Sequence, residues 1–247
     1  PDDEAKAMQI VELLLAAARR VDEAIKPLAC QYAAVPDPSQ QAANAADALA
    51  ESAALNVLLS ADVRVLSEEA GWLGQGSALV VLDPIDGTDN LTRGIPFSGP
   101  SIWARTKQGA CAAVVTNVFT GHTFWATSGS GAFRDDQRLS VAKSRVPDVM
   151  IVGGEYQPLH GLFGRDLGAT AHSLCAVAEG RLAGYRTPAH CPDRAWDLMA
   201  GLVIAGEAGC ILGGIEGDRN PMDDPLSENW VVVAPEMAFA RLSSRPL

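Results

Sequence analysis

The sequence is poor in the residues that build disulfide frameworks and zinc sites. Among 247 residues it has five cysteines and four histidines. The cysteine count is odd and no C-x-x-C spacing occurs, so neither a disulfide scaffold nor a zinc knuckle is supported. Reduced thiols are typical of the cytoplasm, which is the predicted location. No metal-ligand spacing links the histidines, so surface or hydrogen-bonded polar positions are expected for His122, His160, His172 and His190.

Positive charge and long apolar runs are also scarce. The chain has 19 Lys and Arg against 30 Asp and Glu, for a net charge of −11. The basic residues are scattered, which argues against nucleic acid and anionic membranes as partners. No run of 18 apolar residues occurs, and no signal peptide is expected after the acidic start Pro1-Asp2-Asp3-Glu4. An acidic protein that binds a phosphate ester needs cations to reverse the local field.

The most informative segment is residues 79–90, where an apolar run ends in two carboxylates three residues apart. It reads L-V-V-L-D-P-I-D-G-T-D-N, so a buried strand leads to Asp83 and Asp86. Pro84 and Gly87 tighten the backbone between and after them. Carboxylates at the open edge of a sheet suit a hard cation, and such a cation suits phosphate.

Apolar periodicity and turn residues predict an α+β first half and an alternating α/β second half. In the first half we expect helices at 3–28, ended or kinked by Pro27, and at 42–60, short strands at 63–66 and 78–82, and an antiparallel meander over 98–141 with strands near 100–106, 111–118 and 122–127. In the second half we expect strands at 149–152, 182–186, 210–212 and 230–234, helices at 169–179, 196–208 and 235–242, and an irregular stretch at 153–168.

A domain boundary is predicted near residue 145. It separates an N-terminal α+β lobe with the metal site, residues 1–145, from a C-terminal α/β lobe, residues 146–247, that supplies Asp197 and the substrate pocket.

Three further acidic positions accompany the D-P-I-D-G-T segment. They are Asp47 on the second helix, the pair Glu68-Glu69 after a strand, and Asp197 in W-D-L-M-A-G. Taken singly, each is expected to be a solvated or helix-start acid. In this order, however, they resemble the inositol monophosphatase superfamily. The likeness extends along nearly the whole chain through Asn44-Ala45-Ala46-Asp47, Ser130-Gly131-Ala132-Phe133, Leu139-Ser140-Val141 and Arg165-Asp166-Leu167-Gly168.

The resemblance implies a mixed α/β (α+β) fold, the layered α/β/α/β/α sandwich of inositol monophosphatases and fructose-1,6-bisphosphatases. It also implies a Mg²⁺-dependent, Li⁺-sensitive phosphomonoesterase that forms a homodimer and acts on a small phosphorylated substrate. By the same resemblance, one Mg²⁺ is held by Glu68, Asp83 and the Ile85 carbonyl, a second by Asp83, Asp86 and Asp197, and a third, weaker ion lies by Glu68.

Catalytic and substrate residues also follow from the resemblance. Asp47 and Thr88 form a pair that activates the attacking water, with Glu68 beside it and no covalent intermediate. The backbone of Gly87 and Thr88 donates to the phosphate. The remaining candidate substrate residues are Asn90, Arg165, Thr170 and Arg186.

Two departures from the family pattern bear on the substrate. Only a dozen residues separate Val152 from Arg165, so a pocket wall is missing or replaced. Arg186 stands where inositol-type enzymes carry an acid, and with Arg194 or Arg165 it either meets a second anionic group or pairs with Asp193 or Asp166. An unusual sugar or cyclitol phosphate is therefore as well supported as inositol 1-phosphate, with a nucleotide 3′-phosphate or histidinol phosphate as alternatives.

Two other classes compete with this interpretation. A haloacid-dehalogenase-type phosphatase would place D-x-D-G-T after a strand, but this chain has one residue more between the acids, although Lys143 and the run from Gly217 to Asp224 are compatible with that class. A metal-binding pseudoenzyme that acts as a regulator is favoured only by Ala45 and the short segment 153–164, since every ligand position is present.

Overall fold

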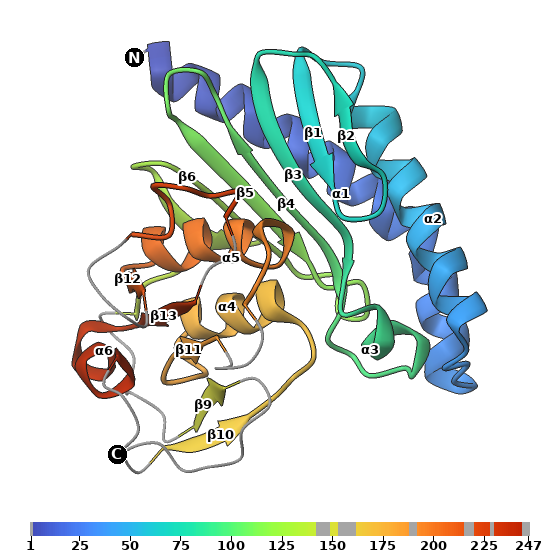
Figure 1. The fold of residues 1–247 in the computed structure, drawn as a ribbon. Helices are drawn as coiled ribbons and strands as arrows, with labels where there is room; N and C mark the ends of the chain where they lie inside the picture. The colour runs from blue at the N-terminus through green and yellow to red at the C-terminus, as the bar shows by residue number, and fades with distance from the viewer. Residues whose placement is uncertain are drawn as a thin grey trace.

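The chain folds into alternating layers of helices and sheets, shown in Figure 1 by a computed structural model. The structure describes residues 2–141, 149–152, 162–187, 192–214, 220–227 and 230–243. Helices α1 (Asp2–Ala34) and α2 (Gln40–Leu58) cover one face of an eight-stranded sheet, while α4 (Thr170–Ala178) and α5 (Ala195–Glu207) separate it from a five-stranded sheet. Helix α6 (Glu236–Ser243) packs on the smaller sheet. The predicted layered α/β/α/β/α fold is confirmed.

The larger sheet brings two parallel strands together near its edge. Its strand order is β2-β1-β3-β4-β5-β6-β7-β8, in which only β1 and β3 are parallel neighbours. The strands are β1 (Val63–Ser67), β2 (Gly71–Gly74), β3 (Ala78–Asp86), β4 (Gly99–Arg105), β5 (Cys111–Thr116), β6 (Thr123–Thr127), β7 (Gly131–Arg134) and β8 (Gln137–Arg138). The predicted antiparallel meander over 98–141 is confirmed as β4 to β8.

The smaller sheet has the strand order β10-β9-β11-β13-β12. Its strands are β9 (Val149–Val152), β10 (Phe163–Arg165), β11 (Tyr185–Arg186), β12 (Ile211–Gly214) and β13 (Val231–Ala234). Alternate residues of β13 belong to different cores, since Val231 and Val233 pack toward α4 and α5 while Val232 and Ala234 pack with α6. A sheet buried on both faces explains why this strand reads as an unbroken apolar run.

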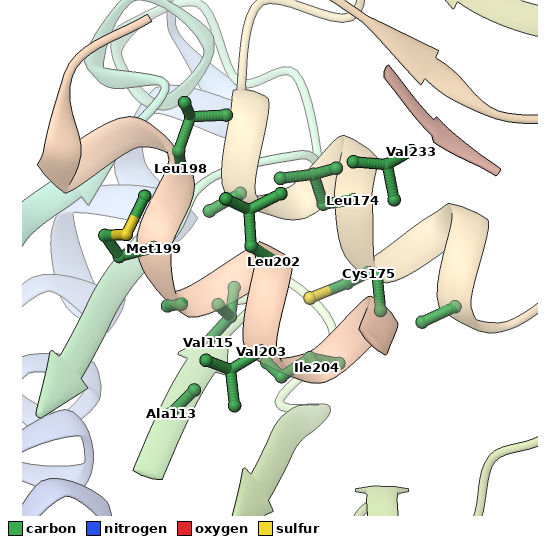
Figure 2. Packing of buried hydrophobic residues seen from close by; sticks show 14 of the residues in the cluster. Ala113, Val115, Leu174, Cys175, Leu198, Met199, Leu202, Val203, Ile204 and Val233 are labelled. Carbon is green, nitrogen blue, oxygen red and sulfur yellow. The ribbon is translucent and has the colours of Figure 1, made fainter. Parts of the chain in front are cut away.

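The central core lies between the two sheets and is built on α4 and α5. Figure 2 shows Leu174 and Cys175 of α4 beside Leu202 and Ile204 of α5, with Val233 of the smaller sheet close by. These side chains are almost fully buried. Dense packing of this kind fixes the starts of both helices relative to the larger sheet, and those helix starts carry site residues.

The prediction that Pro27 ends or kinks the first helix is wrong about its end, because α1 continues to Ala34. Proline lacks the N–H that would bond to the carbonyl four residues earlier. Pro27 is exposed, so water can serve that carbonyl, whereas Ala29 and Tyr32 beyond it are buried. Burial of the continuing apolar stripe holds the last turns in place.

The predicted end of the strand 78–82 is also wrong. Strand β3 continues to Asp86, pairing with β4 at both Asp83 and Asp86 with a register shift between them. A shift of this kind tolerates Pro84, whose missing N–H is not needed for pairing. A short helix, α3 (Thr88–Thr92), follows Gly87 directly.

Two short strands were not predicted. Strand β2 forms a hairpin with β1, and β10 lies within the stretch expected to be irregular, of which residues 153–161 are outside the described residues. The predicted boundary near residue 145 is also outside them and stays a prediction. None of the helices in the described residues combines the length and apolar character needed to cross a bilayer.

Candidate active site

The first two acidic residues are placed by parallel strands that end side by side. Ser67 of β1 lies opposite Leu82 of β3, and the Glu68 N–H donates to the Leu82 carbonyl at 3.0 Å. Glu68 and Asp83 therefore lie side by side where the pairing of β1 with β3 ends, and we call this end of the two strands, with Asp86 beyond it, the acidic edge. The Ile85 N–H donates to Asp83 Oδ1 at 2.9 Å, which fixes this buried carboxylate.

Asp86, at the end of β3, joins this edge to helix α4. Its Oδ1 accepts the Thr170 N–H at 2.9 Å, and its Oδ2 accepts the His172 N–H at 3.0 Å. The N-cap residue of α4 is Ala169, whose side chain cannot accept a hydrogen bond. Asp86 therefore caps α4 from a strand 84 residues earlier in the chain, where the helix dipole also favours a carboxylate.

Asp197 enters the site from the first turn of α5. Its Oδ2 accepts the backbone N–H of Arg194, the N-cap residue, at 2.8 Å, which orients the carboxylate. The Ser101 hydroxyl of β4 donates to the Trp196 carbonyl at 3.2 Å. The start of α5 is thus tied to the larger sheet, next to the acidic residues Glu68, Asp83 and Asp86.

Asp47 reaches the site through Thr88. The Thr88 hydroxyl lies 2.8 Å from Asp47 Oδ1 and 3.1 Å from the Ile85 carbonyl, so its single hydrogen is best placed on Asp47. The Ile85 carbonyl is then free to accept elsewhere. Gly87, with φ +83°, makes the turn before Thr88, and a Cβ there would lie only 2.9 Å from the Ala169 Cβ. Only glycine allows both this backbone and the close approach of α4.

Except for Asp47, which is one residue removed behind Thr88, these groups surround one cavity of about 280 Å³. Of the residues predicted for the site, Glu68, Asp83, Ile85, Asp86, Gly87, Thr88, Thr170 and Asp197 line it. Asp166, Asp193 and Tyr185 also line it, and no Lys or Arg is among its described lining residues.

Several carboxyl groups of the cavity have raised pKa values. Burial first, and then the charges of Glu68, Asp86 and Asp197, raise the pKa of Asp83 well above its ordinary value. Loss of solvent also raises the pKa of Glu68, although its side chain keeps an exposed part at the edge, and burial raises that of Asp197 to about 7. Burial likewise raises the pKa of Asp47 to about 6, against the lowering effect of the Thr88 hydrogen bond. Repulsion of this kind is relieved by a cation.

The donor set fits magnesium. The five predicted ligands offer carboxylate and carbonyl oxygens, which are the ligands that a hard cation prefers, and they are Glu68, Asp83, Ile85, Asp86 and Asp197. Within the described part of the chain, no three acidic, histidine or cysteine side chains already meet around one point. Mg²⁺ does not require this, because it is commonly held by one or two carboxylates and keeps several waters.

Three predicted substrate residues do not line the cavity. The Asn90 side chain is buried and donates to the carbonyls of Phe97 and Leu167. Arg165 is exposed and donates to the Gly164 carbonyl, and the buried Arg186 donates to Leu242 of α6. Because successive residues of a strand point to opposite faces, Tyr185 of β11 takes the place beside the cavity that Arg186 was expected to hold.

Sequence reasoning did not assign Tyr185 or Asp193 to the site. The Tyr185 hydroxyl donates to Asp193 Oδ2 at 2.7 Å, and the Thr187 hydroxyl donates to the same oxygen at 2.6 Å. Burial raises the pKa of Asp193 despite these bonds. The only sequence signal was an acid four residues before Asp197, which was considered as an ion-pair partner.

Comparison with known proteins agrees with the fold and identifies the family. Residues 4–244 match the sequence model of the inositol monophosphatase family. A fructose-1,6-bisphosphatase/inositol-1-monophosphatase of Archaeoglobus fulgidus is 34% identical over 208 residues, or 80% of this chain and 81% of that protein. The Nus factor SuhB of Pasteurella multocida is 30% identical over 77% of each chain.

A solved structure supports the same relationship. The extragenic suppressor protein suhB of Bartonella henselae superposes with a TM-score of 0.78 at 26% identity, covering 95% of this chain and 96% of that one. The chain belongs to the inositol monophosphatase family of metal-dependent phosphoric monoester hydrolases.

Proposed function

We propose that this protein is a Mg²⁺-dependent phosphomonoesterase that acts on a small sugar or cyclitol phosphate. Two or three ions would be held by Glu68, Asp83, the Ile85 carbonyl, Asp86 and Asp197. When bound, the ions would neutralise phosphate charge and lower the pKa of the attacking water. The observation that carries the proposal is a single cavity that is lined by these acidic residues and also by Asp166, Tyr185 and Asp193. We call the latter three residues the substrate wall, because their oxygens can accept hydrogen bonds from substrate hydroxyls.

Thr88 and Asp47 are the proposed route for the proton released by the water. The Thr88 hydroxyl already donates to Asp47 Oδ1, so it can accept a proton from water as it passes its own to the carboxylate. The pKa of Asp47, raised to about 6, places this base close to neutral pH, where a general base is most effective.

Gly87 and Thr88 are the proposed phosphate-binding backbone. Both line the cavity, and Thr88 begins helix α3, so its N–H has no partner within that helix. A phosphate at this position would lie beside the acidic edge, in reach of the ions held there.

The substrate wall is the proposed basis of specificity. Asp193 is fixed through Oδ2 by Tyr185 and Thr187, whereas the one described partner of its Oδ1 is the Thr170 hydroxyl at 3.4 Å. This oxygen can accept a hydrogen bond from a substrate hydroxyl. With acids and no basic side chain among the described lining residues, the wall favours a substrate with one phosphate and several hydroxyls. Of the two activities in the name of the relative from Archaeoglobus fulgidus, the inositol-1-monophosphatase activity lies in this class.

The same acidic wall makes an amino-alcohol phosphate the second candidate. Asp166 and Asp193 would attract an ammonium group as well as they accept from a hydroxyl. A panel of cyclitol, sugar, amino-alcohol and nucleotide phosphates, assayed for phosphate release with Mg²⁺ and with EDTA, separates these possibilities. Preference for fructose 1,6-bisphosphate over every monophosphate would contradict the proposed wall.

Asp193→Asn tests the wall directly. We expect it to lower kcat/KM for the preferred polyol phosphate by about 10–100-fold, the effect of weakening a hydrogen bond to a charged group. The control substrate is p-nitrophenyl phosphate, which has no hydroxyl for Asp193 to contact and should be hydrolysed at nearly the wild-type rate. Equal losses on both substrates would show that Asp193 serves the acidic edge rather than specificity.

A further inference from the structure

The side chain of His172 contacts Asp86, one of the proposed metal ligands. The proposed function does not explain this contact. It lies in the first turn of α4, and its side chain is 2% exposed. Ring nitrogen Nδ1 is 2.7 Å from Asp86 Oδ2. The ring also packs against Phe97, with centroids 5.5 Å apart and planes at 58°.

The surroundings of the ring determine which nitrogen carries hydrogen. Asp86 Oδ2 is an acceptor, so Nδ1 must carry the hydrogen for the short contact to be attractive. Nitrogen Nε2 is buried and has no hydrogen-bond partner among the described residues. A neutral ring with its hydrogen on Nε2 would leave that donor unpaired and set two lone pairs against each other at Nδ1.

The hydrogen bonds to Asp86 divide unequally between its two oxygens. Oδ2 accepts both the backbone N–H and the ring N–H of His172, whereas Oδ1 accepts only the Thr170 N–H among the residues that the structure describes. Each carboxylate oxygen has about two lone-pair directions. Oδ2 is therefore saturated, and Oδ1 keeps one direction for another partner.

We infer that His172 is a positioning residue that saturates Asp86 Oδ2 and so presents Oδ1 as the single oxygen available to a cation. Outer hydrogen-bond partners of this kind hold a ligand's rotamer, and their loss commonly weakens metal binding by about 10–100-fold. The inference rests on the proposed function, because it assigns His172 to the magnesium site described there.

The test compares His172→Leu with His172→Asn in Mg²⁺ titrations followed by calorimetry. Leucine keeps an apolar volume without the donor, whereas asparagine places an amide N–H near the position of Nδ1. We expect Mg²⁺ to bind about 10–100-fold more weakly to His172→Leu and close to wild type in His172→Asn. Val177→Ala, on the same helix and fully buried, controls for damage to packing and should leave Mg²⁺ binding unchanged.

Two results would overturn the inference. One is folded His172→Leu that binds Mg²⁺ as tightly as wild type, and the other is His172→Asn that binds as weakly as His172→Leu. If the leucine variant does not fold, a long-range proton–nitrogen NMR spectrum of Mg²⁺-loaded wild type decides instead. We expect it to show hydrogen on Nδ1 of His172, and a ring without hydrogen on Nδ1 would refute the inference. Wild type that binds no Mg²⁺ at all would refute the proposed function itself, which separates the two failures.

Discussion

Replacing Asp197 with asparagine should stabilise the metal-free protein at alkaline pH. Asparagine keeps the size of the side chain and an oxygen that can accept the Arg194 N–H, but it removes the charge. Burial, and then the charges of Asp86, Asp193 and Glu68, raise the Asp197 pKa from 3.8 to about 7. The ionised carboxylate is therefore a destabilising group in the folded, metal-free chain.

The sign and size of the effect follow from the two pKa values. Below pH 3.8 the carboxyl is protonated in both the folded and unfolded states, so it has no effect on stability. Between 3.8 and about 7 the folded state holds a proton that the unfolded state has released, so stability falls as the pH rises. Above about 7 the full penalty remains, about 4 kcal/mol at about 1.4 kcal/mol per pH unit, and this is an upper limit because neighbouring carboxyls share protons.

The assay is urea unfolding of wild type and Asp197→Asn in EDTA at about pH 5 and about pH 8. The variant should be the more stable protein at the higher pH by up to about 4 kcal/mol, and the gap should narrow at the lower pH. Saturating Mg²⁺ should reverse the order, because it stabilises the protein that binds it more tightly.

Asp62→Asn is the matched control. Asp62 is an exposed acid whose pKa is lowered by hydrogen bonds from Ser77, so its removal should give no gain in stability at alkaline pH. The reasoning is refuted if Asp197→Asn is no more stable than wild type at about pH 8 in EDTA, or if its advantage grows toward acid pH.

Three other substitutions test separate parts of the structure. Thr88→Val should lower kcat by about 10²–10⁴-fold while Mg²⁺ affinity stays unchanged in calorimetry, and Thr88→Ser should restore most of the rate. Glu207→Ala should lower the free energy of unfolding in urea by about 2 kcal/mol without loss of activity, because its carboxylate accepts the N–H groups of Gly129 and Gly131. Ser39→Ala should lower it by about 1 kcal/mol, since the Ser39 hydroxyl caps helix α2.

Features encoded by short stretches of sequence could be predicted. The apolar run into Asp83 and the W-D start of α5 each combine a local backbone preference with an acid. Both acids, Asp83 and Asp197, line the same cavity. The layered fold followed from the order of strands and helices together with the family resemblance. The ligand set, the ion count, the homodimer and Li⁺ sensitivity stay predictions.

Features that depend on distant partners could not be predicted. Arg186 follows Tyr185 in sequence, but strand alternation sends it toward Leu242 and away from the cavity. His172 read as an ordinary polar residue because its partner, Asp86, is 86 residues away. The continuation of α1 past Pro27 likewise depends on burial of Ala29 and Tyr32, which the local rule for proline does not include.

The central claim is that one acidic edge holds the ions that make this chain a phosphomonoesterase. Its most direct test is phosphate release from the best ester of the panel by wild type and Asp83→Asn, each with Mg²⁺ and with EDTA. We expect release only from wild type with Mg²⁺, while circular dichroism shows that the variant stays folded. Release that persists in EDTA, or that survives in folded Asp83→Asn, would contradict the account.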